Sequence, residues 1–241
     1  MKKEIFAIGD VHGEIGLFKK ILSHWRESTQ QFILMGDLGD RGENPKACFL
    51  LAKQLVEEKG AVCLRGNHEE MLLSFLQNPI ENQALYLMNG GKETIESFLY
   101  QGVMQDHSGE EISRMLRRRY PFLEDFLNER PYYAEWGDYI FVHAGVDLKE
   151  KEWKKTSKQD FVWIREGFYD QKNSTGKTIV FGHTITPMLH GDNRTTDIWI
   201  HDNMIGIDGG AVYGGVLHGI VFNKEGIVTQ YHEKNKSSRF F

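Results

Sequence analysis

The sequence of 241 residues contains only two cysteines, Cys48 and Cys63, and no apolar run long enough to cross a membrane. Two cysteines are too few for a disulfide framework, and their apolar surroundings predict buried free thiols in a reducing compartment. A membrane-spanning helix needs about 20 consecutive apolar residues. The apolar stretch from Ile5 to Ile8 is also too short for a signal peptide. We therefore expect a cytoplasmic protein that has no membrane partner.

The chain also has little excess positive charge. It carries 29 Lys and Arg against 34 Asp and Glu, which gives a net charge of −5 at pH 7, and it has no dense basic face. Proteins whose main role is to bind nucleic acid usually carry a basic patch, so this balance argues against a nucleic-acid partner. Any phosphate site must therefore be built locally, from a few well-placed residues.

The first third of the chain alternates short apolar runs with amphipathic segments. This pattern predicts strands at 4–8, 32–35 and 61–64, separated by helices at 14–26 and from Pro45 onward. Such a β-α-β-α-β order predicts parallel strands with helices packed on the sheet. The part after Tyr139 is rich in strand-like runs, which we place at 139–142, 178–181, 198–201, 204–207, 216–222 and 227–232.

The middle of the chain has a different pattern, in which leucines, methionines and aromatic residues recur among many polar ones. We assign residues 69–131 to helices that form a cap or insertion beside the sheet. The whole segment 1–233 is then a single domain of the α/β (α+β) class, and 234–241 is a loose tail.

Polar clusters follow several of the expected strands. Three early strands run into Gly9–Gly13, Gly36–Gly42 and Arg65–Glu69, and two later ones into Val142–Gly145 and Phe181–Thr184. In an open α/β sheet, loops beyond the carboxyl ends of the strands converge on one crevice. The pattern therefore predicts that one point collects Asp10, His12, Asp37, Asn67, His143 and His183.

Each of these pieces has an ordinary explanation when it is taken alone. A single Gly-Asp after a strand is usually a turn, and a single histidine is usually a surface or core residue. Here, however, glycines flank nearly every ligand-type residue, which lets the backbone approach a shared centre closely. Unrelated turns would not repeat this arrangement five times, so we interpret the clusters as one site.

The ordered signatures GDxHG, GDxxDRG and GNHE, followed by separate histidines, resemble the phosphoprotein phosphatase family of the calcineurin-like metallophosphoesterases. The resemblance runs from Asp10 to about Gly215 and leaves the middle segment unmatched. It implies a metallophosphoesterase β-sandwich flanked by helices. It also implies a centre of two divalent metal ions, commonly manganese, with iron or zinc as alternatives.

The resemblance also implies how the ligands are divided between the two ions. The first ion is bound by Asp10 and His12, and Asp37 bridges both ions. The second ion is completed by Asn67, His143 and His183. A mixed set of carboxylate, imidazole and amide ligands suits Mn, Fe or Zn better than Mg or Ca. Two ions about 3.5–4 Å apart can clamp the attacking and leaving oxygens of a phosphate ester.

Further residues would act on the substrate. Arg41 and Arg65 can bind phosphate oxygens through forked, charge-assisted contacts. By resemblance, His68 is the general acid that protonates the leaving alkoxide, and Asp40 orients it and raises its pKa. The segment Trp163-Ile164-Arg165 resembles the family's Trp-x-Arg segment, which makes Arg165 a third phosphate ligand.

Gly39 departs from the family pattern, and the role of Tyr213 is left open. Gly39 occupies a position that is more often Val, which we expect to change loop flexibility rather than chemistry. The segment 206–215 resembles the family's late Ile-Asp-Thr-Gly-Ala motif and is expected to border the site. Within it, Tyr213 either touches the substrate or is a structural aromatic residue.

Three functions follow as hypotheses. The first is a serine/threonine protein phosphatase, because Asp40 accompanies an intact Asn67-His68-Glu69, and relatives that split diadenosine tetraphosphate symmetrically often lack that aspartate. The second is that nucleotide activity, yielding ADP, which the basic run 117–119 favours slightly. The third is a non-catalytic metal-binding scaffold, which the complete set of ligands and the acid histidine disfavours. An open groove would favour protein substrates, and a closed basic pocket would favour the dinucleotide.

Overall fold

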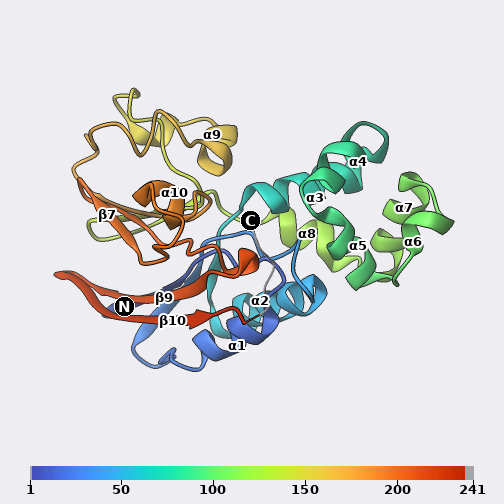
Figure 1. Cartoon of the computed structure of the whole chain (residues 1–241), viewed down its shortest axis with the longest axis horizontal. Coiled ribbons are helices and arrows are strands. Elements are labelled where there is room, and N and C mark those ends of the chain that lie inside the picture. The colour runs from blue at the N-terminus through green and yellow to red at the C-terminus, as the bar shows by residue number, and fades with distance from the viewer. Residues whose placement is uncertain (1, 237–241) are drawn as a thin grey trace.

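The computed structural model describes residues 2–236 and contains two five-stranded sheets packed face to face, with helices on their outer sides (Figure 1). The mixed α/β class expected from the sequence is therefore confirmed. Apolar side chains from both sheets meet between them, among them Ile5, Ile33, Phe141 and Phe222. Full burial of such a side chain contributes roughly 1.5–3 kcal/mol.

The first sheet has the order β10-β9-β1-β2-β3. Its strands are β1 (Glu4–Ile8), β2 (Gln30–Leu34), β3 (Val62–Cys63), β9 (Val216–Asn223) and β10 (Gly226–Lys234). β1, β2 and β3 are parallel, as the β-α-β-α-β pattern predicted. The connections are α1 (Ile15–Leu22) and α2 (Pro45–Lys59). The Asn44 side chain caps α2 by accepting a hydrogen bond from the Ala47 backbone N–H.

The second sheet has the order β4-β5-β6-β8-β7. Its strands are β4 (Tyr133–Trp136), β5 (Tyr139–Val142), β6 (Thr178–Phe181), β7 (Trp199–His201) and β8 (Met204–Gly206). β5, β6 and β8 are parallel, so their carboxyl ends lie at one edge. β4 was not predicted, because its four residues do not alternate between buried and exposed positions. It pairs with β5 in an antiparallel manner across the tight turn at Gly137. The outer side of this sheet carries α9 (Lys158–Trp163) and α10 (Thr186–His190).

Six helices lie between β3 and β4 and extend away from the sheets (Figure 1). They are α3 (Asn67–Gln77), α4 (Pro79–Met88), α5 (Gly91–Phe98), α6 (Val103–Asp106), α7 (Gly109–Arg119) and α8 (Phe122–Asn128). Phe98 and Phe126 of this segment pack against Phe49 of α2, which ties the helices to the first sheet's outer layer. Below we call residues 67–128 the helical segment.

The first residues of the predicted tail 234–241 are part of the fold rather than loose. Lys234 is the last residue of β10, and the Asn235 side chain donates a hydrogen bond to the Ala211 carbonyl oxygen at 3.0 Å. Residues 237–241 of the predicted tail lie outside the described residues.

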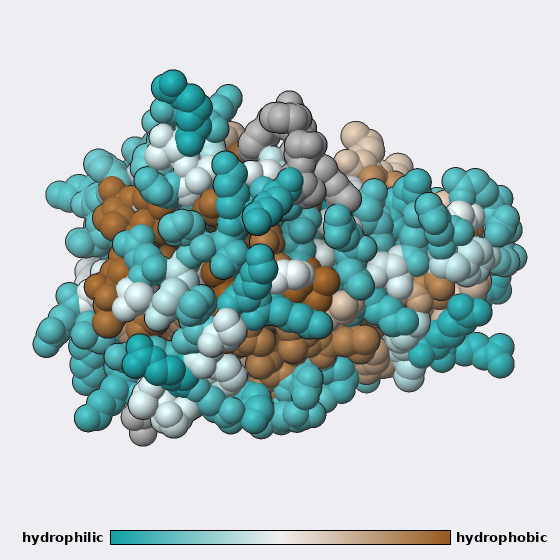
Figure 2. All heavy atoms as spheres, turned by 60° about the horizontal axis from the view of Figure 1, so that its bottom comes forward, coloured by the Kyte–Doolittle hydropathy of each residue, from teal (hydrophilic) through white to brown (hydrophobic). Residues whose placement is uncertain are grey.

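Among residues 2–236, no helix has the length and apolar character that a membrane span requires. Figure 2 shows hydrophilic side chains over most of the face that it turns forward.

Candidate functional site

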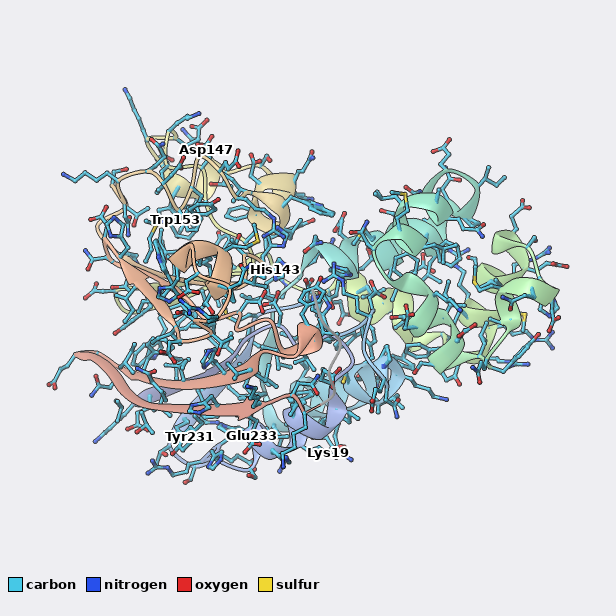
Figure 3. All side chains as sticks on the ribbon, viewed as in Figure 1. Lys19, His143, Asp147, Trp153, Tyr231 and Glu233 are labelled. Atoms are coloured by element: carbon cyan, nitrogen blue, oxygen red, sulfur yellow. The ribbon has the colours of Figure 1, made fainter. Side chains whose placement is uncertain are left out.

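The residues predicted as metal ligands lie just beyond the ends of five strands, and the structure brings them together. They follow β1 (Asp10 and His12), β2 (Asp37), β3 (Asn67), β5 (His143) and β6 (His183). Three of these strands belong to the first sheet and two to the second, so both sheets contribute to the site. Figure 3 shows His143 near the middle of the molecule, where the sheets meet the helical segment.

The backbone at this site adopts left-handed conformations that residues other than glycine rarely take. His12, Asp37 and His183 have φ angles of 43°, 51° and 61°, and Asp40 and Arg41 have 67° and 64°. Such left-handed conformations cost free energy and persist only where the surrounding structure enforces them. One enforcing contact is the hydrogen bond from the His12 N–H to the Asp37 carbonyl oxygen at 2.8 Å.

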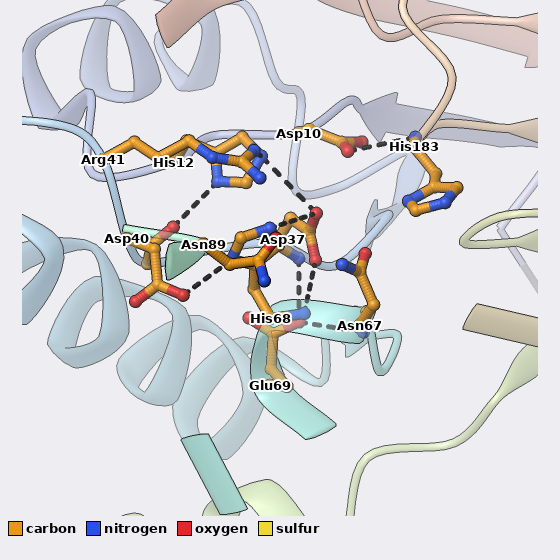
Figure 4. Close-up of polar contacts among 12 residues, drawn as sticks. Asp10, His12, Asp37, Asp40, Arg41, Asn67, His68, Glu69, Asn89 and His183 are labelled. Carbon is orange, nitrogen blue, oxygen red and sulfur yellow. Dashed lines mark hydrogen bonds and ion pairs between the residues drawn. The ribbon is translucent and has the colours of Figure 1, made fainter. Parts of the chain in front are cut away.

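Asp37 lies at the centre of the cluster (Figure 4). Its Oδ2 is 3.4 Å from His12 Nε2, and its Oδ1 is 3.5 Å from His143 Nε2. Two groups of potential metal ligands share it, one with His12 and His68 and the other with His143 and His183; within each group the ligand atoms lie within 4.8 Å of one another. Asp37 is thus the one residue common to both groups, and the first group contains His68 where the sequence analysis expected Asp10.

Glu69, to which the sequence analysis gave no role, ties two of the loops together. Its Oε2 accepts hydrogen bonds from the Asp37 and Gly66 N–H groups, and its Oε1 accepts one from Leu38, all at 2.8 Å. The side chain is completely buried. Glu69 therefore fixes the loop that carries Asp37 against the start of α3, which carries Asn67.

Hydrogen bonds to carbonyl oxygens determine which nitrogen of each histidine can bind a metal. His12 and His143 donate their Nδ1–H to the carbonyls of Gly39 and Met35, each at 2.9 Å, which turns Nε2 toward the cluster; in His143 this nitrogen lies 2.9 Å from Asn67 Oδ1. His183 donates Nε2–H to the Trp163 carbonyl at 3.3 Å, which leaves Nδ1. Orienting bonds of this kind are typical of metal-binding histidines.

The charges at the site are suited to cations. Burial, together with the charges of Asp208 and Asp37, raises the pKa of Asp10 well above its ordinary value, and burial also raises the pKa of Asp37. Burial lowers the pKa of His143 to about 4 and that of His12 well below its ordinary value, so both rings are neutral at pH 7. Buried carboxylates that lie together beside neutral imidazoles are what a divalent ion would stabilise.

A second observation supports the fit of metal ions. Asp10 Oδ2 accepts a hydrogen bond from the His183 N–H at 3.0 Å, but its buried Oδ1 has no donor among the described residues. The loop after β6 approaches this oxygen so closely that a Cβ atom on Gly182 would lie 2.1 Å from it. Buried polar atoms are rarely left without a partner, and a cation would satisfy this one. The six predicted ligands therefore fit divalent metal ions.

Asp40 and His68 form a buried pair beside this cluster. Asp40 Oδ2 lies 2.6 Å from His68 Nδ1, as expected for a carboxylate that orients the ring. The expected rise in the histidine pKa is not found: burial lowers the pKa of His68 to about 3, and the opposing charge of Asp37 does not compensate. Burial also raises the pKa of Asp40 to about 7. Desolvation dominates the pKa of both groups because both are fully enclosed.

The three predicted phosphate-binding arginines lie in different places. Arg41 and Arg165 line the cavity above the cluster, and Arg165 Nη1 donates to the His183 carbonyl oxygen at 2.9 Å. Arg65 does not line this cavity. Its guanidinium donates instead to the carbonyl oxygens of Leu127 and Asn128, at 2.9 and 2.7 Å. In this structure Arg65 therefore anchors the end of α8 rather than facing the site.

The cavity has a volume of about 340 Å³ and includes residues that sequence reasoning did not name. The loop of residues 206–215 borders it as expected, through Tyr213 and also through Asp208, whose charge contributes to the raised pKa of Asp10. Asn89, from the helical segment, lines it as well. Asp208 belongs to the segment that resembles the Ile-Asp-Thr-Gly-Ala motif and was expected to border the site, whereas Asn89 has no motif around it.

Gly39 has a different role from the one expected. A Cβ atom at this position would lie 2.6 Å from the Phe49 ring and 3.0 Å from Thr94 Oγ1. Its importance is therefore close packing against α2 and the helical segment rather than flexibility of the loop.

Comparison with known proteins agrees with this geometry. The family model described as "calcineurin-like phosphoesterase" matches residues 3–207. The chain is 29% identical over 221 residues to serine/threonine-protein phosphatase 1 of Salmonella typhimurium, covering 89% of this chain and 90% of that protein. It is 25% identical to an asymmetrical bis(5'-nucleosyl)-tetraphosphatase of Oceanobacillus iheyensis, covering 94% and 91%.

A solved structure shares the fold. The cold-active protein-tyrosine phosphatase of a psychrophilic Shewanella species superposes with a TM-score of 0.64 at 16% identity, covering 97% of this chain and 80% of that one. The family match extends over most of the sequence and includes every predicted metal ligand. The chain thus belongs to the calcineurin-like phosphoesterase family, whose members use divalent metal ions to hydrolyse phosphate esters.

Proposed function

We propose that this phosphoesterase is a serine/threonine protein phosphatase that uses two divalent ions, manganese in the cell. The observation that carries the proposal is the 2.6 Å contact between Asp40 Oδ2 and His68 Nδ1 beside the cavity. A serine alkoxide is a poor leaving group and needs a proton as the bond to phosphorus breaks, whereas a nucleotide phosphate is a better one. An oriented histidine at this place therefore suits a phosphate ester of an alcohol.

The remaining roles follow from position. Asp10, His12, Asp37, Asn67, His143 and His183 would hold the two ions, which when bound lower the pKa of a water molecule and so supply the attacking nucleophile. Arg41 and Arg165 would bind phosphate oxygens from two sides of the cavity. Phosphate bound there would place negative charge beside His68 and favour its protonated form, ready to donate to the leaving oxygen.

The experiment that tests the proposal compares three substrates on one manganese-loaded sample: a phosphoserine peptide, a phosphotyrosine peptide and diadenosine tetraphosphate. We expect the highest kcat/KM with the phosphoserine peptide. The reason is that the proton from His68 speeds departure of an alkoxide more than departure of a phenolate or a phosphate. A preference for the dinucleotide by an order of magnitude or more would overturn the assignment.

The alternative function is hydrolysis of dinucleoside tetraphosphates. It is favoured by the relative in Oceanobacillus iheyensis and by Trp163 and Tyr213, two aromatic side chains that line the cavity and could stack on a base. The products would identify the position of cleavage: ADP alone means symmetrical cleavage, whereas AMP and ATP together mean asymmetrical cleavage.

We also propose that the protein works in the cytoplasm. Cys48 and Cys63 are both buried free thiols, and burial raises the pKa of each well above its ordinary value, so neither forms the reactive thiolate readily. Such thiols are compatible with a reducing compartment. Recovery of the protein in the membrane or secreted fraction of cells would contradict this placement.

A further inference from the structure

The helical segment sends two hydroxyl groups to the pair formed by Asp40 and His68. The Tyr86 hydroxyl, in the last turn of α4, donates a hydrogen bond to Asp40 Oδ1 at 2.9 Å. The Thr94 hydroxyl, on α5, donates to the same oxygen and accepts a bond from the Asp40 N–H at 2.8 Å. Tyr86 and Thr94 are both fully buried, so water does not compete for these bonds.

These two bonds determine which oxygen of Asp40 meets the histidine. With Oδ1 held by two hydroxyls, the plane of the carboxylate is fixed and Oδ2 faces His68 Nδ1. The ring is then oriented with its Nε2 toward Asp37 Oδ2, at 3.9 Å, and so toward the metal-ligand cluster. The terminal torsion of an aspartate has a broad energy profile. Without the two hydroxyls, the Asp40 carboxylate would therefore not be held in one orientation.

The contact between the helical segment and the loop of Asp40 is built for close approach. A Cβ atom on Gly90 would lie 2.6 Å from Arg41 Cγ and 3.0 Å from the Arg41 backbone nitrogen. The Arg41 N–H also donates to the Gly90 carbonyl oxygen at 3.1 Å. The segment therefore lies directly on the loop, and no larger side chain fits between them.

We propose that Tyr86 and Thr94 are positioning residues for the proton transfer by His68: their hydroxyls orient Asp40, and Asp40 orients the ring. This inference rests on the proposed role of His68 as the general acid. It gives helices α4 and α5, which the sequence signatures do not cover, a part in catalysis beyond that of a cap. Neither Tyr86 nor Thr94 lines the cavity.

The test uses two substrates that differ in their need for a proton. 4-Nitrophenyl phosphate releases a stable anion, whereas a phosphoserine peptide releases an alkoxide. In Tyr86→Phe and Thr94→Val we expect kcat for the peptide to fall about tenfold or more, since general acid catalysis contributes roughly 10²–10⁴-fold. The kcat for 4-nitrophenyl phosphate and both KM values should change much less. Thr94→Ser keeps a hydroxyl and should restore peptide turnover.

A matched control removes a tyrosine hydroxyl elsewhere in the same segment. The Tyr120 hydroxyl donates to the Phe98 carbonyl oxygen at 2.8 Å, and none of its hydrogen bonds involves Asp40 or His68. Tyr120→Phe should therefore leave the ratio of the two kcat values unchanged. Melting temperatures of all variants identify any that do not fold. Tyr86→Phe keeps the ring that fills the core, so it remains informative if Thr94→Val is unstable.

The outcomes separate this inference from the proposed function. Equal losses on both substrates in Tyr86→Phe and Thr94→Val, or no loss, would overturn the positioning role. His68→Asn provides the reference, because it should affect the peptide far more than 4-nitrophenyl phosphate. If His68→Asn discriminates and the hydroxyl variants do not, only the positioning role fails. If His68→Asn does not discriminate, the acid role and this inference fail together.

Discussion

The guanidinium nitrogen Nη1 of Arg41 lies 2.8 Å from His12 Nε2, the ring nitrogen that would face a metal ion. One lone pair cannot accept this hydrogen bond and bind a metal at the same time. Metal binding and this contact therefore exclude each other, and a bound ion would turn Arg41 toward the phosphate.

The first prediction concerns Arg41→Ala. Removing the guanidinium takes away both a competitor for His12 Nε2 and a positive charge, so the affinity for Mn²⁺ should rise several-fold. The KM for 4-nitrophenyl phosphate should rise about tenfold or more, because a charge-assisted contact contributes roughly 1.5–3 kcal/mol. Calorimetric titration with Mn²⁺ and steady-state kinetics measure the two effects. Arg194→Ala, at an exposed arginine, is the control, and weaker Mn²⁺ binding by Arg41→Ala would contradict the argument.

The second prediction concerns removal of the metal. Protein stripped with a chelator should be inactive toward 4-nitrophenyl phosphate and should recover with Mn²⁺. Mn²⁺ should also raise the melting temperature, because saturation at 100 times the Kd stabilises the folded state by about 2.7 kcal/mol.

Asp37→Asn should abolish both responses to Mn²⁺, since Asp37 belongs to both groups of ligands. Full activity in chelator would rule out the metal-dependent mechanism. A normal rise in melting temperature for Asp37→Asn would show that the ions bind elsewhere.

The third prediction concerns Glu69→Gln. The two carboxylate oxygens accept three backbone N–H groups, and an amide offers only one acceptor oxygen. The free energy of unfolding should therefore fall by about 2–4 kcal/mol, as measured by urea denaturation. Glu70→Gln is the control at the neighbouring position, where a partly exposed ion pair with Arg65 contributes up to about 1 kcal/mol. Similar losses in the two variants would refute the bridging role of Glu69.

The fourth prediction concerns Gly39→Val, which restores the residue type more usual at this position in the family. The side chain would collide with Phe49 and Thr94, and overpacking of this kind typically costs about 1–3 kcal/mol. Gly16→Ala is the control, because a Cβ atom there meets nothing within 4 Å and Ala favours the helix α1. If Gly39→Val were as stable as the parent protein, the helical segment could not be packed as described.

Much of the site could be predicted because its signals are local. Asp10, Asp37 and Asn67 each follow a short buried strand at once, and parallel strands bring their carboxyl ends to one edge. The same rule predicted that His143 and His183 join them, and the structure places these two histidines after β5 and β6 of the second sheet. Strand β4 was missed because its residues do not alternate clearly between buried and exposed positions.

The sequence by itself determined the family, because the strand-end motifs are encoded within a few residues, and the two-sheet fold followed from that resemblance. It also predicted a set of side chains that could bind metal. Only the tertiary structure decided what surrounds that set. The contacts of Thr94 and Tyr86 with Asp40 span 54 and 46 positions, and Arg65 turned to α8 rather than to the cavity. These outcomes depend on how the helical segment packs on the loops, and packing between distant segments leaves no periodic or motif signal in the chain.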